Sequence, residues 1–333
     1  MSAPLDVPGS TAEAQPEAVL EGASGKTIQG RSLGQIAWNR LKRDKVAMSG
    51  AFVVIFLILV AIFAPVVVRL FGHPPLEFHQ EMIDPVTQIP KGGSGISSEF
   101  LFGVEPQTGR DLFSRVVYGS RISLLIAFCA TLLSVLIGTV MGIVAGYFGG
   151  WVDYIISRLM DVFLAFPLLV FALALVGVLA QFEQQLGIKG DSLRIALLIF
   201  VIGFFNWPYI GRIIRGQTLS LREREFVDAA RSLGARGPYI LFREILPNLI
   251  APILIYATLL IPSNVLFEAA LSFLGVGVQA PTPTWGGLLS EAVKYYTVPH
   301  FMFFPGMAIF ITVLAFNLFG DGLRDALDPK SSR

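Results

Sequence analysis

The sequence is short of charge. Only 15% of its 333 residues are Asp, Glu, Lys or Arg, while 54% are hydrophobic, and the mean hydropathy is +0.67. Soluble domains carry about 25% charged residues. This deficit excludes an ordinary soluble globular protein and predicts an integral membrane protein. The formal net charge of +1 gives no indication of a nucleic-acid partner.

Residue types that carry enzyme chemistry are also scarce. A single cysteine, Cys129, excludes an internal disulfide. The run GGSG that ends at Gly95 has a spacing seen in intramembrane proteases, but it lies in a polar stretch and no apolar block holds a partner histidine. A His-Glu-x-x-His zinc motif is absent. We therefore expect no catalytic residues and no metal site. The three histidines lack the i, i+4 spacing of a helical metal site: His73, His79 and His300.

The N-terminal part of the chain has few large apolar residues. Residues 1–30 are rich in small and polar types, and we expect a disordered cytoplasmic tail without a signal peptide. Gly25-Lys26-Thr27 resembles the end of a phosphate-binding loop, but no apolar strand precedes it, so we expect no nucleotide or other cofactor in this chain. Residues 31–46 are basic with one apolar side, which predicts an interfacial helix.

Six apolar blocks are long enough to cross a bilayer, which takes about 20 residues. We therefore predict an all-α membrane protein, with residues 47–121 forming the first span and a long external loop, 122–323 a five-span core, and 324–333 a cytoplasmic C-terminus. Glycines at every fourth position of the second block predict close helix contact: Gly138, Gly142 and Gly146. The blocks cover residues 47–68, 122–147, 154–180, 193–214, 249–274 and 303–323.

The distribution of positive charge predicts the orientation. With the N-terminus inside, the inner side receives 17 of the 25 Lys and Arg residues. Inner loops of membrane proteins carry the excess of these residues. We therefore expect both termini in the cytoplasm.

Polar residues within the blocks are candidates for a solute pathway, because such residues are costly in a bilayer. Asp161 lies three residues after Arg158, so structural pairing on one helix face is the favoured alternative for it. Glu268 lies near the outer end of the fifth block, where a pathway position and an interfacial position are equally expected. Asn264 is the third candidate.

The stretch 222–247 is the longest charge-rich run between two apolar blocks in the later part of the chain. Phe226, Val227, Ala230 and Leu233 recur at helical spacing and predict a short amphipathic helix. Gly234 suits the left-handed turn that ends a helix. Gly237 and Pro238 then indicate a second helical piece, and Pro247 leads into the next apolar block.

This stretch resembles a known signature. Asp228-Ala229-Ala230, Gly234 after three residues and Leu246-Pro247 match the cytoplasmic signature of binding-protein-dependent ABC importer permeases. Asp228 replaces the usual Glu, and Glu244 takes the place of an Ile. Between residues 31 and 329 the chain is also similar to the C-type permease subunit of dipeptide and oligopeptide importers. The similar blocks include FGVEPQTGRDLFSRVVYGSRISL, WVDYIISRLMDVFLAFP and NLFGDGLRDALDP.

The resemblance implies a non-catalytic permease of the type I importer kind, with six spans and cytoplasmic coupling helices, in the bacterial inner membrane. It implies a homologous B-type permease subunit, two ATPase subunits that bind ATP and Mg, and an extracytoplasmic substrate-binding protein as partners, with membrane lipid around them. Di- or oligopeptides are the implied substrates. A permease for nickel or another small solute and a self-sufficient secondary carrier are the alternatives. The implied docking residues are Glu225, Asp228, Ala229, Ala230, Leu233, Gly234, Pro238 and Pro247.

Overall fold

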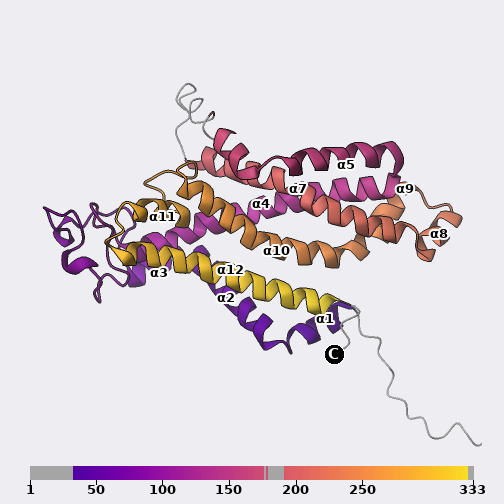
Figure 1. Ribbon diagram of the computed structural model, residues 1–333. Helices are drawn as coiled ribbons and strands as arrows, with labels where there is room; N and C mark the ends of the chain where they lie inside the picture. Colours follow the sequence, from indigo (N-terminus) through magenta and orange to yellow (C-terminus); the bar gives the residue numbers. More distant parts are fainter. Residues whose placement is uncertain (1–32, 176–177, 179–190, 329–333) are drawn as a thin grey trace, which may run out of the picture.

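The computed structural model describes residues 33–175, 178 and 191–328, so the predicted tail at 1–30 lies outside the described residues. These residues fold into helices joined by loops, and no strand occurs among them (Figure 1). The longer helices run side by side as one elongated bundle. The α-helices are α1 (Leu33–Leu41), α2 (Lys45–Ile62), α3 (Ala64–Phe71), α4 (Leu112–Phe148), α5 (Gly150–Ala165), α7 (Asp191–Arg222), α8 (Glu225–Ser232), α9 (Gly237–Tyr239), α10 (Leu246–Phe273), α11 (Trp285–Val293) and α12 (Pro299–Leu327).

Five helices are long and apolar enough to cross a membrane, and a bent pair gives a sixth. This agrees with the six predicted spans, although several bounds differ. The first predicted span, 47–68, is split at Phe63, where α2 ends and α3 begins with Pro65 in its first turn. The second begins ten residues earlier than predicted, since the side chain of Asp111 accepts a hydrogen bond from the Phe113 amide and caps α4.

The third predicted span, 154–180, is not one continuous helix. Helix α5 ends at Ala165, and a second helix, Leu168–Leu175, leaves it at an angle of 78°. Pro167 causes this break, because a proline disfavours helical geometry in the residue before it. Phe166 accordingly has an extended backbone, with φ −82° and ψ 127°. The third predicted span is therefore a bent pair of helices, and its break at Pro167 was not predicted.

Helices α4 and α7 form the tightest helix pair of the bundle. A Cβ atom added to Gly138 would lie 2.7 Å from the Trp207 carbonyl oxygen, and one added to Gly142 would lie 2.6 Å from the Gly211 carbonyl oxygen. These distances are shorter than any side chain allows, so the two backbones touch. The close contact predicted from the glycine spacing is confirmed. Ser134 reinforces it with a 2.8 Å hydrogen bond to the Gly203 carbonyl.

The two ends of the bundle carry different elements. Helix α11 and the loop between α3 and α4 lie at one end, and α8 and α9 lie at the other (Figure 1). Helix α4 spans the distance between these ends, since its 37 residues reach about 55 Å at 1.5 Å per residue. Anything that contacts both ends of α4 is therefore joined by one rigid element.

We predict that Gly142→Val destabilises the protein, because its new side chain meets the backbone of α7, which cannot move aside like a flexible side chain. Forcing extra atoms into a packed interface costs about 1–3 kcal/mol. The measurement is the unfolding temperature of the purified protein in detergent. Gly216→Val is the matched control, because a Cβ at this position on α7 meets nothing within 4 Å. Equal unfolding temperatures for the two variants would contradict the backbone contact.

Candidate functional site

The stretch 222–247 forms a helix that ends in a glycine turn, as predicted. Gly234 has a φ of +81°, in the left-handed region. The Ala235 amide donates to the Ala230 carbonyl at 3.0 Å, and the Gly234 amide donates to the Arg231 carbonyl at 2.9 Å. These two bonds make a Schellman motif, which satisfies the last carbonyls of α8. The turn is therefore fixed by hydrogen bonds rather than being a loose loop.

This turn presents apolar side chains to the surroundings. Leu233 is 89% exposed and Phe242 is 69% exposed, although both are large and apolar. A pocket of about 480 Å³ lies beside the turn and is lined by residues on both sides of Gly234, among them Ala230, Leu233 and Tyr239. Exposed apolar groups around a hollow are typical of a surface that binds another protein.

A buried contact joins α8 to the bundle. Val227 is 0% exposed and belongs to one apolar cluster with Ile143 of α4 and Ile214 of α7. Arg222, the last residue of α7, donates to the Tyr147 carbonyl at 3.2 Å, at the C-terminal end of α4. The helix, the turn and the ends of α4 and α7 are thus packed as one unit.

The second helical piece differs from the prediction. It begins at Gly237 with Pro238 in its first turn, as expected. It is not a separate short piece but is continuous with the next apolar block. A π-helical segment, η3 (Ile240–Ile245), continues it into α10, and Gly237–Phe273 forms one unbroken candidate span. Proline is tolerated in the first turn of a helix, and Pro247 occupies that place in α10, so the chain passes it without a break.

The remaining predicted residues of this stretch lie together at the same end of the bundle. Glu225 and Asp228 are exposed in the first turn of α8, where acidic residues complement the helix dipole. Asp228 accepts a 3.1 Å hydrogen bond from Arg231. Ala229 is exposed and Ala230 is half-buried, so only short side chains cover the helix surface next to the turn.

The three predicted pathway residues lie in two different environments. Asp161 is exposed and pairs with Arg158 at 3.5 Å, as the sequence spacing predicted, and with Arg212 of α7 at 2.7 Å. Asn264 and Glu268 are both 0% exposed. Asn264 accepts from Asn206 of α7 and donates to Thr131 of α4, each at 2.8 Å. Ser272 donates to the Glu268 carboxylate at 2.7 Å.

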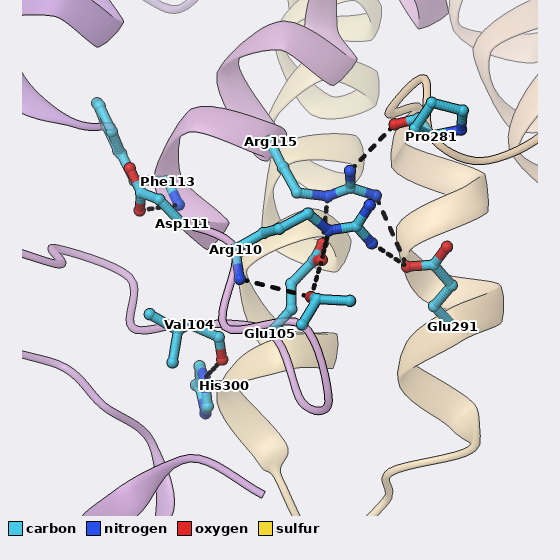
Figure 2. A network of polar contacts seen from close by, with 10 residues as sticks. Val104, Glu105, Arg110, Asp111, Phe113, Arg115, Pro281, Glu291 and His300 are labelled. Atoms are coloured by element: carbon cyan, nitrogen blue, oxygen red, sulfur yellow. Dashed lines mark hydrogen bonds and ion pairs between the residues drawn. The ribbon is translucent and has the colours of Figure 1, made fainter. Parts of the chain in front are cut away.

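The opposite end of the bundle contains a buried ionic network that the sequence did not reveal (Figure 2). Glu105, in the loop before α4, is 1% exposed and accepts from Arg110 Nε at 2.7 Å. It also pairs with Arg115 in the first turn of α4. Both guanidinium groups approach Glu291 of α11, at 3.7 and 3.6 Å. Arg115 further donates to the Pro281 carbonyl at 3.1 Å.

This network joins α11 to the loop 72–111 and the adjoining start of α4, which are far from α11 in the sequence. Burial raises the pKa of Glu105, and the positive charges of Arg115 and Arg110 oppose that rise. The loop 72–111, the start of α4 and α11 are held together by these charges. His300 adds a contact from α12, because its Nε2 lies 3.2 Å from the Val104 carbonyl.

The bundle, with its five or six candidate spans among the described residues, its exposed turn at one end and its ion-paired loops at the other, defines a helical multi-span membrane protein. Residues 138–333 match the family described as binding-protein-dependent transport system inner membrane component. Residues 32–82 match the N-terminal transmembrane domain of oligopeptide transport permease C. The chain belongs to the binding-protein-dependent transport system inner membrane component family, and it is a permease subunit of an ABC importer.

Curated relatives cover most of the chain. The dipeptide transport system permease protein DppC of Alkalihalophilus pseudofirmus is 41% identical over 295 residues, which cover 88% of this chain and 89% of the relative. The glutathione transport system permease protein GsiD of Escherichia coli is 41% identical over 294 residues, with the same coverage. The GsiD protein of Pectobacterium atrosepticum is 38% identical, covering 88% of this chain and 90% of the relative.

A solved structure shows the same fold. A chain of the MetNI methionine ABC transporter in an inward-facing conformation matches with a TM-score of 0.53 and 17% sequence identity. The match covers 65% of this chain and 98% of the other chain. The predicted fold class, that of an importer permease, is confirmed.

We predict that Glu105→Gln lowers stability strongly. It leaves the buried Arg115 guanidinium without its nearest carboxylate, and breaking a buried ion pair costs about 3–5 kcal/mol. The measurement is the thermal unfolding of the purified protein. Glu99→Gln in the same loop is the control, because the Glu99 side chain is 72% exposed and exposed pairs contribute at most about 1 kcal/mol. A shift no larger than that of the control would argue against a stabilising network.

Proposed function

We propose that this permease subunit imports di- or oligopeptides and receives its driving force from an ATPase subunit that docks at the turn around Gly234. Support for the substrate comes from the names of the relatives, which are permeases for dipeptides and for glutathione, itself a tripeptide. A permease for nickel or another small solute is the alternative. The observation that carries the docking proposal is the rigid, apolar turn exposed at one end of the bundle.

The docking surface is defined by α8 and the turn that follows it. An ATPase would contact the exposed Leu233 and the pocket beside it, with Glu225, Asp228, Ala229, Ala230, Gly234 and Pro238 around that contact. A large apolar side chain that inserts into a partner is typical of a residue that dominates an interface. Pro247 contributes by starting α10 behind this surface.

Movement of the docked helix would be transmitted directly into the spans. Val227 shares a buried cluster with residues of α4 and α7, and α9 runs on through η3 into α10. Closing of an ATPase dimer would therefore move α4, α7 and α10 together as a unit. Such rigid-body motion opens a transport pathway first to one side of the membrane and then to the other.

The chain would act as one part of a larger assembly in the bacterial inner membrane, with both termini in the cytoplasm. Its partners would be a homologous B-type permease subunit, two ATPase subunits, an extracytoplasmic substrate-binding protein and membrane lipid. ATP and Mg would be bound by the ATPase subunits, and this chain itself would be non-catalytic.

Copurification tests this assignment against a self-sufficient carrier. We expect the tagged chain, co-expressed with the other genes of its transport system, to bring down an ATPase and a second permease. We also expect peptide uptake into proteoliposomes to require the complete complex and ATP. Uptake by the purified chain alone would contradict the importer assignment.

We predict that Gly234→Val abolishes transport, because a β-branched residue is strained at a φ of +81° and the turn that carries Leu233 would be distorted. The ATPase should fail to copurify, while the substrate-binding protein still binds its ligand. Gly237→Ala is the control, since a Cβ there makes only an ordinary contact of 3.6 Å with Tyr147. Normal uptake by the Gly234 variant would contradict the docking role.

Among the pathway candidates, we propose different roles according to burial. Asp161 would face the solute, because its side chain is 49% exposed. Asn264 and Glu268 of α10 would stabilise the wall of the pathway without contacting the solute, since both are buried.

A further inference from the structure

Three charged side chains lie uncovered on one face of α5 and α7. The side chains of Arg158, Asp161 and Arg212 are 63%, 49% and 55% exposed. Asp161 lies between the two arginines, with Arg212 Nη2 at 2.7 Å and Arg158 Nη1 at 3.5 Å from its two carboxylate oxygens. A second pair between the same helices, Asp153 with Arg215, is more covered, at 20% and 30% exposure.

This face belongs to candidate membrane spans, namely α7 and the bent pair made of α5 and the helix after its break. Trp151 and Tyr154 are exposed at the start of α5, and such aromatic residues are enriched where the hydrocarbon core begins. Asp161 follows Trp151 by ten residues, which is about 15 Å along a helix. The hydrocarbon core is about 30 Å thick. With its boundary at Trp151, the Asp161 carboxylate falls inside the core.

Lipid is an unfavourable environment for the charged side chains of this face. Charged side chains within spans almost always face a bundle interior or a water-filled cavity. The exposed surface of α4 provides the contrast, because Leu132, Leu136 and Val140 form a purely apolar stripe there. An apolar stripe of this kind suits lipid, whereas the α5–α7 face does not.

The break after Ala165 is an independent observation that points to the same face. Phe166 and Pro167 are exposed and interrupt the helix at membrane depth. Irregular backbone at this depth is tolerated only where it is covered by protein or lines a water-filled cavity. This break lies about one turn beyond Asp161 in the sequence.

We propose that Arg158, Asp161 and Arg212 line the water-filled part of the solute pathway and attract solutes that carry a free carboxylate. The inference rests on the proposed import function and deepens it. One carboxylate between two guanidinium groups leaves an excess of one positive charge. A water-filled passage bounded by protein focuses such a charge on a passing anion. The carboxyl terminus of a short peptide is an anion of this kind.

Thiol labelling of the assembled complex in membrane vesicles tests the proposal. In a Cys129→Ala background, which removes the sole native thiol, Leu164→Cys places a reporter one turn beyond Asp161, at a position 44% exposed. We expect it to react with both anionic and cationic membrane-impermeant methanethiosulfonates. Leu136→Cys on the apolar stripe, 56% exposed, is the matched control and should stay unreactive. A Leu164 reporter as unreactive as the control would overturn the proposal.

The ratio between the labelling rates of the anionic and the cationic reagent reports the charge of the pathway. Removing one positive charge with Arg212→Gln should lower the anionic-to-cationic ratio at the Leu164 reporter by roughly sevenfold, from Coulomb's law in water at about 7 Å, because the lost charge acts with opposite sign on the two reagents. An unchanged ratio would overturn the carboxylate preference. Copurification of the ATPase is measured on the same vesicles, so an unreactive reporter in an intact complex counts against this inference and leaves the import function standing.

Discussion

The contact between the backbones of α4 and α7 is the constraint on which the other features depend. Gly138 and Gly142 leave no room for a side chain between the two helices, so the pair forms a single rigid unit. Helix α8 is attached to this unit through Val227, and α5 is attached to α7 through ion pairs at Asp153 and Asp161. A looser contact between α4 and α7 would disconnect the exposed turn from the membrane spans.

Helix α4 also links the two ends of the molecule. Arg115, in its first turn, takes part in the ionic network that holds the loop 72–111 and α11. The Tyr147 carbonyl, in its last turn, accepts a hydrogen bond from Arg222 beside the exposed turn at Gly234. No break interrupts the helix between these two points. A displacement at one end is therefore carried to the other along a single hydrogen-bonded rod, and no chain of separate contacts is needed.

Sequence reasoning found features that depend on neighbours in the chain. The turn at Gly234, the glycine stripe of α4 and the pairing of Arg158 with Asp161 each follow from residue types at fixed short spacings. It missed partners brought together by the fold, such as Arg212, which lies 51 residues from Asp161, and Glu291 of the ionic network around Glu105. Charge alone does not reveal such pairs, because their distance depends on how the helices pack. It also missed the break at Pro167, since the apolar run continues through it without a change in composition.

The π-helical segment η3 makes the geometry of the end that carries α8 depend on the number of residues in that segment. A π-helical turn holds about one residue more than an α-helical turn, and each residue of an α-helix advances the helix by about 100°. Loss of one residue between Ile240 and Ile245 would restore regular α-helix and swing α8 around the axis of α10 by roughly that angle. Leu233 would then point in another direction, although every span remained intact. Variation in length at this segment is therefore far less tolerable than variation in side-chain identity.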